Sequence, residues 1–309
     1  MSDRLVCAAD GTARSAGAIC TAFAIGRALG MRTVLVHVAQ ANDRSAAKAR
    51  TRAAADLERS LAGLPVPPDT VRRIEVGDPA ELVVAAAEDE DASIILTGTR
   101  EAGARAKAMF GSVASRIVEL ARVPVVIAPQ ACCDSALAGD VPAVPEVIIA
   151  VDGSDESRFV AALAARLAKR ARAEIVLAHV VPPLTPAAAP PVGIVPPLTH
   201  TEQAAGRRVL QRAWQALPDP DGVEVELLEG VPSRALEELS RERGAGLIVL
   251  GTRRPGRVRR LLSGSIADEL AASGERPVMV IPDDVARRAS EGVSETTQQL
   301  PSSQAAPSV

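Results

Sequence analysis

Short apolar runs alternate along this chain with longer segments whose apolar residues recur at helical spacing. Arg4–Ala9 and Thr33–Val38 are short and apolar, and Arg14–Leu29 between them has the period of an amphipathic helix. The alternation continues with a helix at Asp43–Leu61, a strand at Val71–Val76, a helix at Pro79–Glu90, a strand at Ser93–Thr97, a helix at Ser112–Ala121 and a strand at Val125–Ala128. The second half repeats this order. The pattern predicts an α/β fold, with a parallel sheet covered by helices on both faces.

The second half repeats the first at the level of single residues. Asp10 corresponds to Asp152 at an offset of 142 residues, and Gly98 corresponds to Gly251 at an offset of 153. A net insertion of 11 residues in the second half explains the change of offset. The proline-rich segment Pro182–Thr199 is the natural place for it. The chain is therefore a duplication, with one longer connection in its second copy.

The duplication predicts two tandem domains, each a doubly wound five-stranded parallel sheet with strand order 3-2-1-4-5. We expect residues 1–130 to form the first domain, residues 146–282 the second, and residues 131–145 the linker. Residues 283–309 end in polar, unpatterned sequence and are expected to form a disordered tail. Two similar halves can pack like the subunits of a symmetric dimer. The last strands, Val123–Ala128 and Pro277–Ile281, are therefore expected to meet at a pseudo-twofold interface, and a further homodimer stays open.

Composition narrows the function classes. Aromatic residues make up 1% of the chain, which weighs against a protein that stacks single-stranded nucleic acid, and the net charge of −3 provides no field that attracts DNA or anionic membrane. The four cysteines have neither zinc-site nor disulfide-framework spacing. Seven prolines between Pro182 and Pro197 exclude a membrane span there. With no signal peptide, the cytoplasm is the expected location.

One sequence pattern in each half is typical of a phosphate site. Gly-Thr-Arg, then ten residues, then Gly-Ser occurs at Gly98–Ser112 and again at Gly251–Ser265. Each copy follows an apolar run and precedes a helix. Glycine permits close backbone approach, and a helix N-terminus provides free N–H groups and a partial positive charge. Each half therefore has its own candidate anion site.

Other repeated polar residues also follow predicted strands. Asp10 and Asp152 follow the first strand of each half, and His37 and His179 lie near the end of the second. Ligands of open α/β sheets bind at the carboxyl ends of the strands where the strand order reverses. The aspartates could instead only cap the following turn, and both interpretations stay open. Because no other ligand type lies at suitable spacing, the histidines are expected to make a packing or polar contact, not to bind a metal.

The ordered motifs resemble those of the universal stress protein family. They are Ile148–Ser154 (IIAVDGS), Ala178–Val181 (AHVV), Leu228–Gly230 (LEG) and the Gly-Thr-Arg loop, and they occur as two tandem copies. The nucleotide-binding branch of that family has a loop of the form G-x2-G-x9-G-[ST]. The resemblance implies that this loop holds ATP, accompanied by Mg²⁺, through backbone contacts to phosphates and ribose, with the early aspartate near the adenine.

The resemblance implies one nucleotide site in each half. The corresponding residues are Asp152, Val180, Gly251, Arg253, Arg254, Gly264, Ser265 and Ile266 in the second half, and Asp10, Val38, Gly98, Arg100, Gly111, Ser112 and Val113 in the first. The chain departs from the family pattern at the middle glycine, which is Glu101 in one half and Arg254 in the other. A carboxylate repels phosphates and a guanidinium attracts them. The second site is therefore expected to be the stronger one.

The sequence contains no enzyme motif such as a P-loop, a G-x-S-x-G elbow or H-E-x-x-H. The leading hypothesis is therefore a regulatory stress-response protein that binds ATP and acts on a protein partner that the sequence does not name. One alternative is an interaction module of the same fold that binds no nucleotide. The other is a weak ATPase, because slow hydrolysis in the loop stays open.

Overall fold

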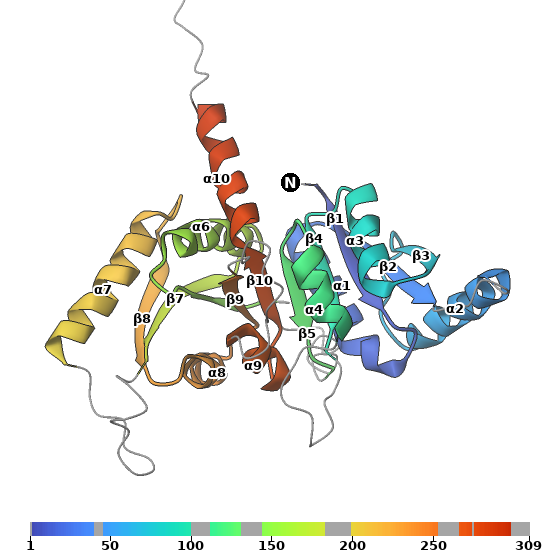
Figure 1. Cartoon of the computed structure of the whole chain (residues 1–309), viewed down its shortest axis with the longest axis horizontal. Helices are drawn as coiled ribbons and strands as arrows, with labels where there is room; N and C mark the ends of the chain where they lie inside the picture. Colours follow the sequence, from blue (N-terminus) through green and yellow to red (C-terminus); the bar gives the residue numbers. More distant parts are fainter. Residues whose placement is uncertain are drawn as a thin grey trace, which may run out of the picture.

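A computed structural model describes residues 2–39, 46–99, 112–130, 144–182, 199–252, 266–273 and 275–297. Strands and helices alternate through both halves, which lie side by side around a shared central sheet (Figure 1). This is the α/β class that the hydrophobic pattern predicts.

The described residues of the first half form five strands and four α-helices. The strands are β1 (Arg4–Ala9), β2 (Arg32–Ala39), β3 (Val71–Val76), β4 (Ile94–Gly98) and β5 (Val125–Ala128). The helices are α1 (Ala16–Leu29), preceded by the 3₁₀ turn η1 (Ala13–Ser15), then α2 (Ala46–Ser60), α3 (Pro79–Asp89) and α4 (Ser112–Leu120). Asp78 caps α3 by accepting hydrogen bonds from the backbone N–H groups of Ala80 and Glu81, and Pro79 occupies the first helical position.

The described residues of the second half form the same series and one helix more. The strands are β6 (Glu146–Ala150), β7 (Glu174–Val181), β8 (Val223–Glu229), β9 (Leu247–Thr252) and β10 (Val278–Pro282). The helices are α6 (Asp155–Arg170), α7 (His200–Gln215), α8 (Pro232–Arg243), α9 (Ile266–Ser273) and α10 (Asp283–Thr297). At the start of α7, Thr199 and Glu202 form a capping box in which each side chain bonds the backbone N–H of the other.

All ten strands form one continuous sheet in the order β3-β2-β1-β4-β5-β10-β9-β6-β7-β8. Within each half the order is 3-2-1-4-5 and every pairing is parallel, as predicted. The order reverses between β1 and β4 in the first half, and between β6 and β9 in the second. These two reversals are the positions where a doubly wound sheet binds ligands.

The two halves join through their last strands. β5 and β10 pair antiparallel, with Val125 opposite Val280 and Ile127 opposite Val278. This is the contact expected between the segments 123–128 and 277–281. Because the pairing is antiparallel, the strands of the two halves run in opposite directions along the sheet. A fully buried, mostly β-branched ladder thus connects the two copies.

Side chains from alternate positions of the central strands enter opposite layers of core. Leu5 and Cys7 of β1 pack on the side of α1 and α6, whereas Val6 packs on the side of α3 and α8. Each layer extends through both halves, as Leu35 and Leu177 do on the first side. The core is almost entirely aliphatic, and Phe23 of α1 is its one buried phenylalanine among the described residues.

Residues from 283 onward correct one expectation. α10 follows β10 directly and packs along α6, where Val285 and Ala286 are buried and Ala289 contacts the same core. Arg166 of α6 also donates a hydrogen bond to the carbonyl oxygen of Ala289 at 3.3 Å. The expected disordered tail is therefore wrong for residues 283–297, because apolar residues three and four positions apart give them a face to bury. Residues 298–309 lie outside the described part.

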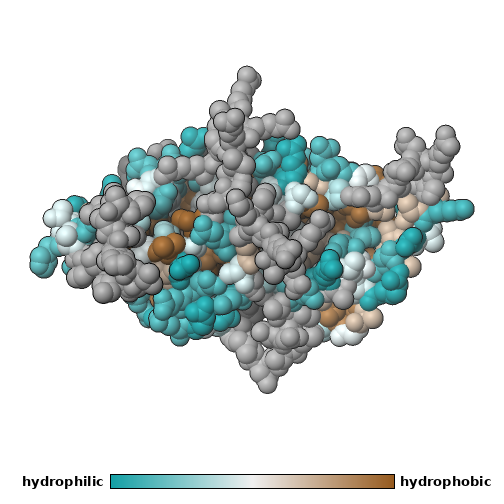
Figure 2. Space-filling view, turned by 60° about the horizontal axis from the view of Figure 1, so that its bottom comes forward, coloured by the Kyte–Doolittle hydropathy of each residue, from teal (hydrophilic) through white to brown (hydrophobic). Residues whose placement is uncertain are grey.

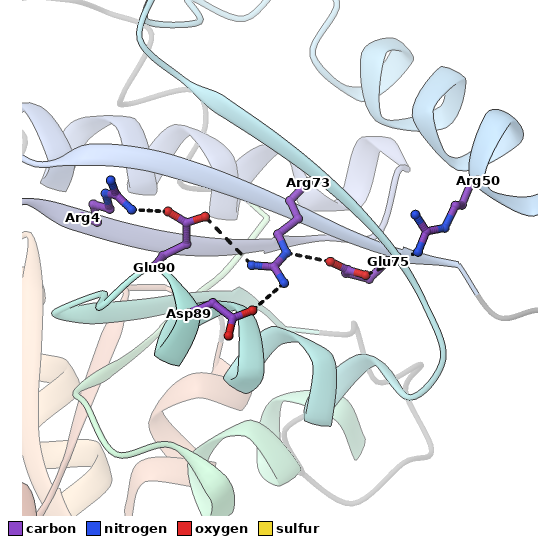
Figure 3. A network of polar contacts seen from close by, with 6 residues as sticks. All are labelled: Arg4, Arg50, Arg73, Glu75, Asp89 and Glu90. Atoms are coloured by element: carbon purple, nitrogen blue, oxygen red, sulfur yellow. Dashed lines mark hydrogen bonds and ion pairs between the residues drawn. The ribbon is translucent and has the colours of Figure 1, made fainter.

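A network of charged side chains connects β1, β3 and the end of α3 in the first half (Figure 3). Arg73 of β3 donates from Nε to Oε1 of Glu75 at 2.6 Å and from Nη2 to Oδ2 of Asp89 at 2.7 Å. Its Nη1 lies 3.9 Å from Oε1 of Glu90, which also pairs with Arg4 of β1. The hydrogen bonds to Glu75 and Asp89 raise the pKa of Arg73. The network attaches the end of α3 to the sheet.

The surface is mostly hydrophilic in the view of Figure 2, where apolar residues gather in two smaller areas, one on each side of the middle. The large apolar side chains with substantial exposure come from separate elements, among them Trp214 of α7 and Val225 of β8. Isolated exposed apolar residues of this kind are normal on a folded protein. Among the described helices, none has the length and apolar composition to cross a bilayer.

Candidate functional site

Asp10 organises the turn that follows β1. Its Oδ1 accepts hydrogen bonds from the backbone N–H of Thr12 at 2.9 Å, from the hydroxyl of Thr12 at 2.7 Å and from the hydroxyl of Ser15 at 3.0 Å. Gly11 within the turn has φ of +71°, a conformation that favours glycine. Asp10 therefore does cap the turn that follows its strand. All of these bonds use one carboxylate oxygen, and Asp10 stands at the exposed end of its strand.

Asp152 builds the same turn after β6. Its Oδ1 accepts from the backbone N–H of Ser154 at 2.9 Å and from the Ser154 hydroxyl at 2.6 Å, and Gly153 has φ of +84°. Ser154 then caps α6 by accepting from the N–H of Ser157. The two halves therefore present an aspartate at matching places on matching strands, each held by its own turn.

The histidines support these turns from the neighbouring strand. Nδ1 of His37 on β2 lies 2.7 Å from the carbonyl oxygen of Ala9, and Nδ1 of His179 on β7 lies 2.7 Å from that of Val151. The partner is a carbonyl, so Nδ1 carries the proton and donates it. This polar contact between strand ends is what the sequence predicts. Among the described residues, no group of three His, Cys, Asp or Glu side chains is placed to bind a metal.

The first glycine of each Gly-Thr-Arg loop lies at or near the end of the strand that pairs with the aspartate's strand. Gly98 is the last residue of β4, which pairs with β1, and Gly251 lies near the end of β9, which pairs with β6. A Cβ on Gly98 would meet only Ala18 and a carbonyl at ordinary contact distance. A Cβ on Gly251 would lie 3.0 Å from Cγ2 of Val160 and 3.2 Å from Oδ1 of Asp283. The backbone is therefore more closely surrounded where the second loop begins, at Gly251, than at Gly98.

Part of the predicted set lies within the described residues. Val38 near the end of β2 is half-buried and Val180 near the end of β7 is buried. Ser112 and Val113 begin α4, and Ile266 begins α9. The remaining predicted residues, which lie outside the described part of the chain, are Arg100, Gly111, Arg253, Arg254, Gly264 and Ser265. The aspartate and the strand-end glycine thus lie at one sheet edge in each half, whereas the grouping of the remaining residues around them stays a prediction.

Three further neighbours of the two sites were not predicted from the sequence. Asp283, the first residue of α10, lies beside Gly251. Beside Gly11 lies the Cβ of Asp56 of α2, at 3.0 Å from where a Cβ on that glycine would be, whereas Val209 of α7 has the corresponding position beside Gly153. Aligning α2 with α7 at the offset of 153 would have paired Asp56 with Val209. The alignment alone would not have shown that both side chains touch the aspartate turn.

Comparison with known proteins adds three findings. A family model described as "Universal stress protein family" matches residues 1–129 and again residues 145–282. A universal stress protein of Methanocaldococcus jannaschii is 30% identical over 138 residues, which cover 44% of this chain and 81% of that protein. The crystal structure of a universal stress protein from Archaeoglobus fulgidus has a TM-score of 0.64 at 19% identity and covers 92% of this chain and 99% of that one.

The likeness to the Archaeoglobus fulgidus structure extends over both halves and shows that the fold is shared. A universal stress protein solved in complex with cAMP covers 45% of this chain and 98% of its own, with a TM-score of 0.35 at 22% identity. The family model matches each half separately.

Proposed function

Because this chain belongs to the universal stress protein family, we propose that it is a regulatory protein that binds ATP at the strand ends of each half, more tightly in the second. The observation that carries the proposal is the repetition of one local structure. Asp10 and Asp152 are held by equivalent turns, and each follows a strand that pairs with the strand carrying Gly98 or Gly251 at its end or near it. In a doubly wound sheet this is where a nucleotide binds.

The residues have distinct roles in the proposed site. The loops that begin at Gly98 and Gly251 would surround the phosphates with backbone N–H groups, and the helix starts at Ser112 and Ile266 would direct their positive ends at the same charge. The strand-end aspartates would contact the base. Mg²⁺ would enter with the nucleotide, because Mg²⁺ in such sites is held largely by phosphates and water.

Charge supports the preference for the second half. Its loop contains Arg253, Arg254 and three further arginines up to residue 260, whereas the first loop contains Glu101. The neighbour of the aspartate turn points the same way, since Asp56 is a carboxylate and Val209 is uncharged. Asp56 is partly neutralised by Arg52 and Arg59. Asp283 beside Gly251 acts in the opposite direction, so the preference depends on the arginines outweighing one carboxylate.

One experiment tests the proposal directly. The full chain is purified without added nucleotide, denatured, and the released small molecules are identified by mass spectrometry. ATP in stoichiometric amount supports the regulatory ATP-binding role. ADP together with measurable turnover would favour the weak ATPase. No released nucleotide, and no binding of added ATP, would favour an interaction module in which Asp10 and Asp152 only cap their turns.

A further inference from the structure

A cavity of the second half lies between the first turn of α6 and the C-terminal part of α7. Its volume is about 340 Å³, and its lining includes Ser154, Ser157, Arg158, Val209, Arg212 and Gln215. A volume of this size lies within the range of small-molecule pockets in proteins. The lining combines two guanidinium groups and hydroxyls with the apolar side chain of Val209.

The two arginines differ in their partners. Nη1 of Arg158 lies 4.0 Å from Oδ1 of Asp155, at the limit of an ion pair, and its guanidinium also stands over the ring of Phe159 at 5.0 Å. Arg212 has no carboxylate within ion-pair distance among the residues that the structure describes. Asp155 is the one acidic residue that lines the cavity, so the lining has a net positive charge.

The first half shows why Arg212 lacks an acidic partner. The residue that corresponds to Arg212 is Arg59 of α2, which forms an ion pair with Asp56 one turn earlier on the same helix. The residue that corresponds to Asp56 is Val209. In the first half the guanidinium of Arg59 is therefore neutralised by a carboxylate of its own helix. In the second half valine replaces that aspartate, so the guanidinium of Arg212 lines the cavity without such a partner. The duplication provides its own comparison.

We propose that this cavity between α6 and α7 binds a small organic phosphate through Arg158 and Arg212. Guanidinium groups donate paired hydrogen bonds that match phosphate oxygens. The hydroxyls of Ser154 and Ser157 are not counted as further donors, because they already donate to Asp152 and to the carbonyl oxygen of Ser154. Val209 provides an apolar wall for the organic part of the ligand. We do not expect an equivalent site in the first half, because Arg59, which corresponds to Arg212, already forms an ion pair with Asp56.

The phosphate cavity and the start of the loop proposed to hold the ATP phosphates lie on opposite sides of β6. α7 and β7 lie on one side of β6, whereas β9 with Gly251 lies on the other. The turn at Gly153 and Ser154 lines the cavity, and Gly153 lies against Val209 of α7. The inference therefore does not depend on ATP binding.

Trp214 makes the test specific, because it is the only tryptophan of the chain and the chain has no tyrosine. It lies on α7 between the cavity residues Ala213 and Gln215 and is 37% exposed. The full chain is titrated with inorganic phosphate against chloride at constant ionic strength while Trp214 fluorescence is followed. Val209→Asp restores the acidic partner present in the first half, and Val209→Asn changes shape and polarity equally without charge.

The proposal predicts a saturable fluorescence change in the wild type and in Val209→Asn, and a midpoint raised about tenfold or more in Val209→Asp. Equal midpoints for the wild type and Val209→Asp would overturn it, as would equal loss in both variants. Because Val209 also adjoins the aspartate turn, the comparison with ATP uses Arg212→Gln, which changes a cavity residue away from that turn. Arg212→Gln should raise the phosphate midpoint about tenfold and leave the calorimetric ATP affinity unchanged, and a parallel loss of both would contradict a separate cavity. If no variant binds ATP, the phosphate result stands by itself.

Discussion

Nε of Arg243 lies 3.2 Å from Oε2 of Glu146, so that the last residue of α8 is tied to the first residue of β6. The corresponding residues of the first half are Glu90 and Arg4, which form the same pair with the charges exchanged. The position therefore requires opposite charges and accepts either arrangement. Hydrogen bonds to Glu224 and Glu146 raise the pKa of Arg243.

Exchanging these charges in the second half gives a first prediction. Glu146→Arg alone places two guanidinium groups together where residue 146 is nearly buried, and we expect a loss of about 2–3 kcal/mol in the free energy of unfolding. The double variant Glu146→Arg, Arg243→Glu recreates the order of the first half and should recover most of the loss. Urea denaturation of the three proteins measures it.

The first half is the control for that exchange. Arg4 is 44% exposed and Glu90 21% in their side chains, so Glu90→Arg should cost less than about 1 kcal/mol. The interpretation is wrong if the double variant in the second half is no more stable than Glu146→Arg.

A second prediction concerns the contact between α1 and the end of β5. A Cβ on Gly17 would lie 2.1 Å from the carbonyl oxygen of Pro129, a backbone atom that cannot rotate away. Gly17→Ala should therefore destabilise the chain by about 2–3 kcal/mol, although alanine favours helix.

Gly206→Ala in α7 is the matched change. Its Cβ would meet Cδ1 of Leu227 at 2.5 Å, the end of a side chain that can move. The free energy of unfolding should then change by less than about 1 kcal/mol. Equal losses in Gly17→Ala and Gly206→Ala would contradict the assignment of the first to a backbone clash.

A third prediction follows from Cys7. Burial raises the pKa of its thiol from 9.0 to about 12, so the native protein at pH 8 should not be alkylated at Cys7 by iodoacetamide, whereas the denatured chain should be. The folded pKa exceeds the unfolded one. Its contribution to stability is therefore complete below pH 9 and is lost as the pH rises towards 12, by up to about 4 kcal/mol.

Cys7→Ala removes this titration. The difference in unfolding free energy between the variant and the wild type should be constant below pH 9 and should change in favour of the variant above it. A constant difference up to pH 12 would show that the thiol does not titrate in this way.

The strand order, the pairing of the two halves and the aspartate turns could be predicted because they depend on local pattern. Asp-Gly after an apolar run predicts a turn at a strand end, as found at Asp10 and Asp152. The alternation of strands and helices, repeated in both halves, predicts the strand order. The pairing of β5 with β10 followed from the symmetry of a duplicated chain.

Other features depend on which elements meet in space. The helix at Asp283–Thr297 was missed because its few apolar residues precede a long polar stretch, and only the groove along α6 gives Val285 a place to be buried. The exchange of Asp56 for Val209 is visible in the sequence, but its effect on Arg212 requires the geometry of α7 beside α6.

Calorimetric titration of the full chain with ATP and Mg²⁺ tests the central claim most directly. The account predicts one dominant site, which Gly264→Val abolishes by adding bulk where the phosphates meet the backbone, and which Gly111→Val leaves largely intact. The preference for the second half is contradicted if Gly111→Val is the more damaging change. The absence of binding in the wild type would contradict the ATP site itself.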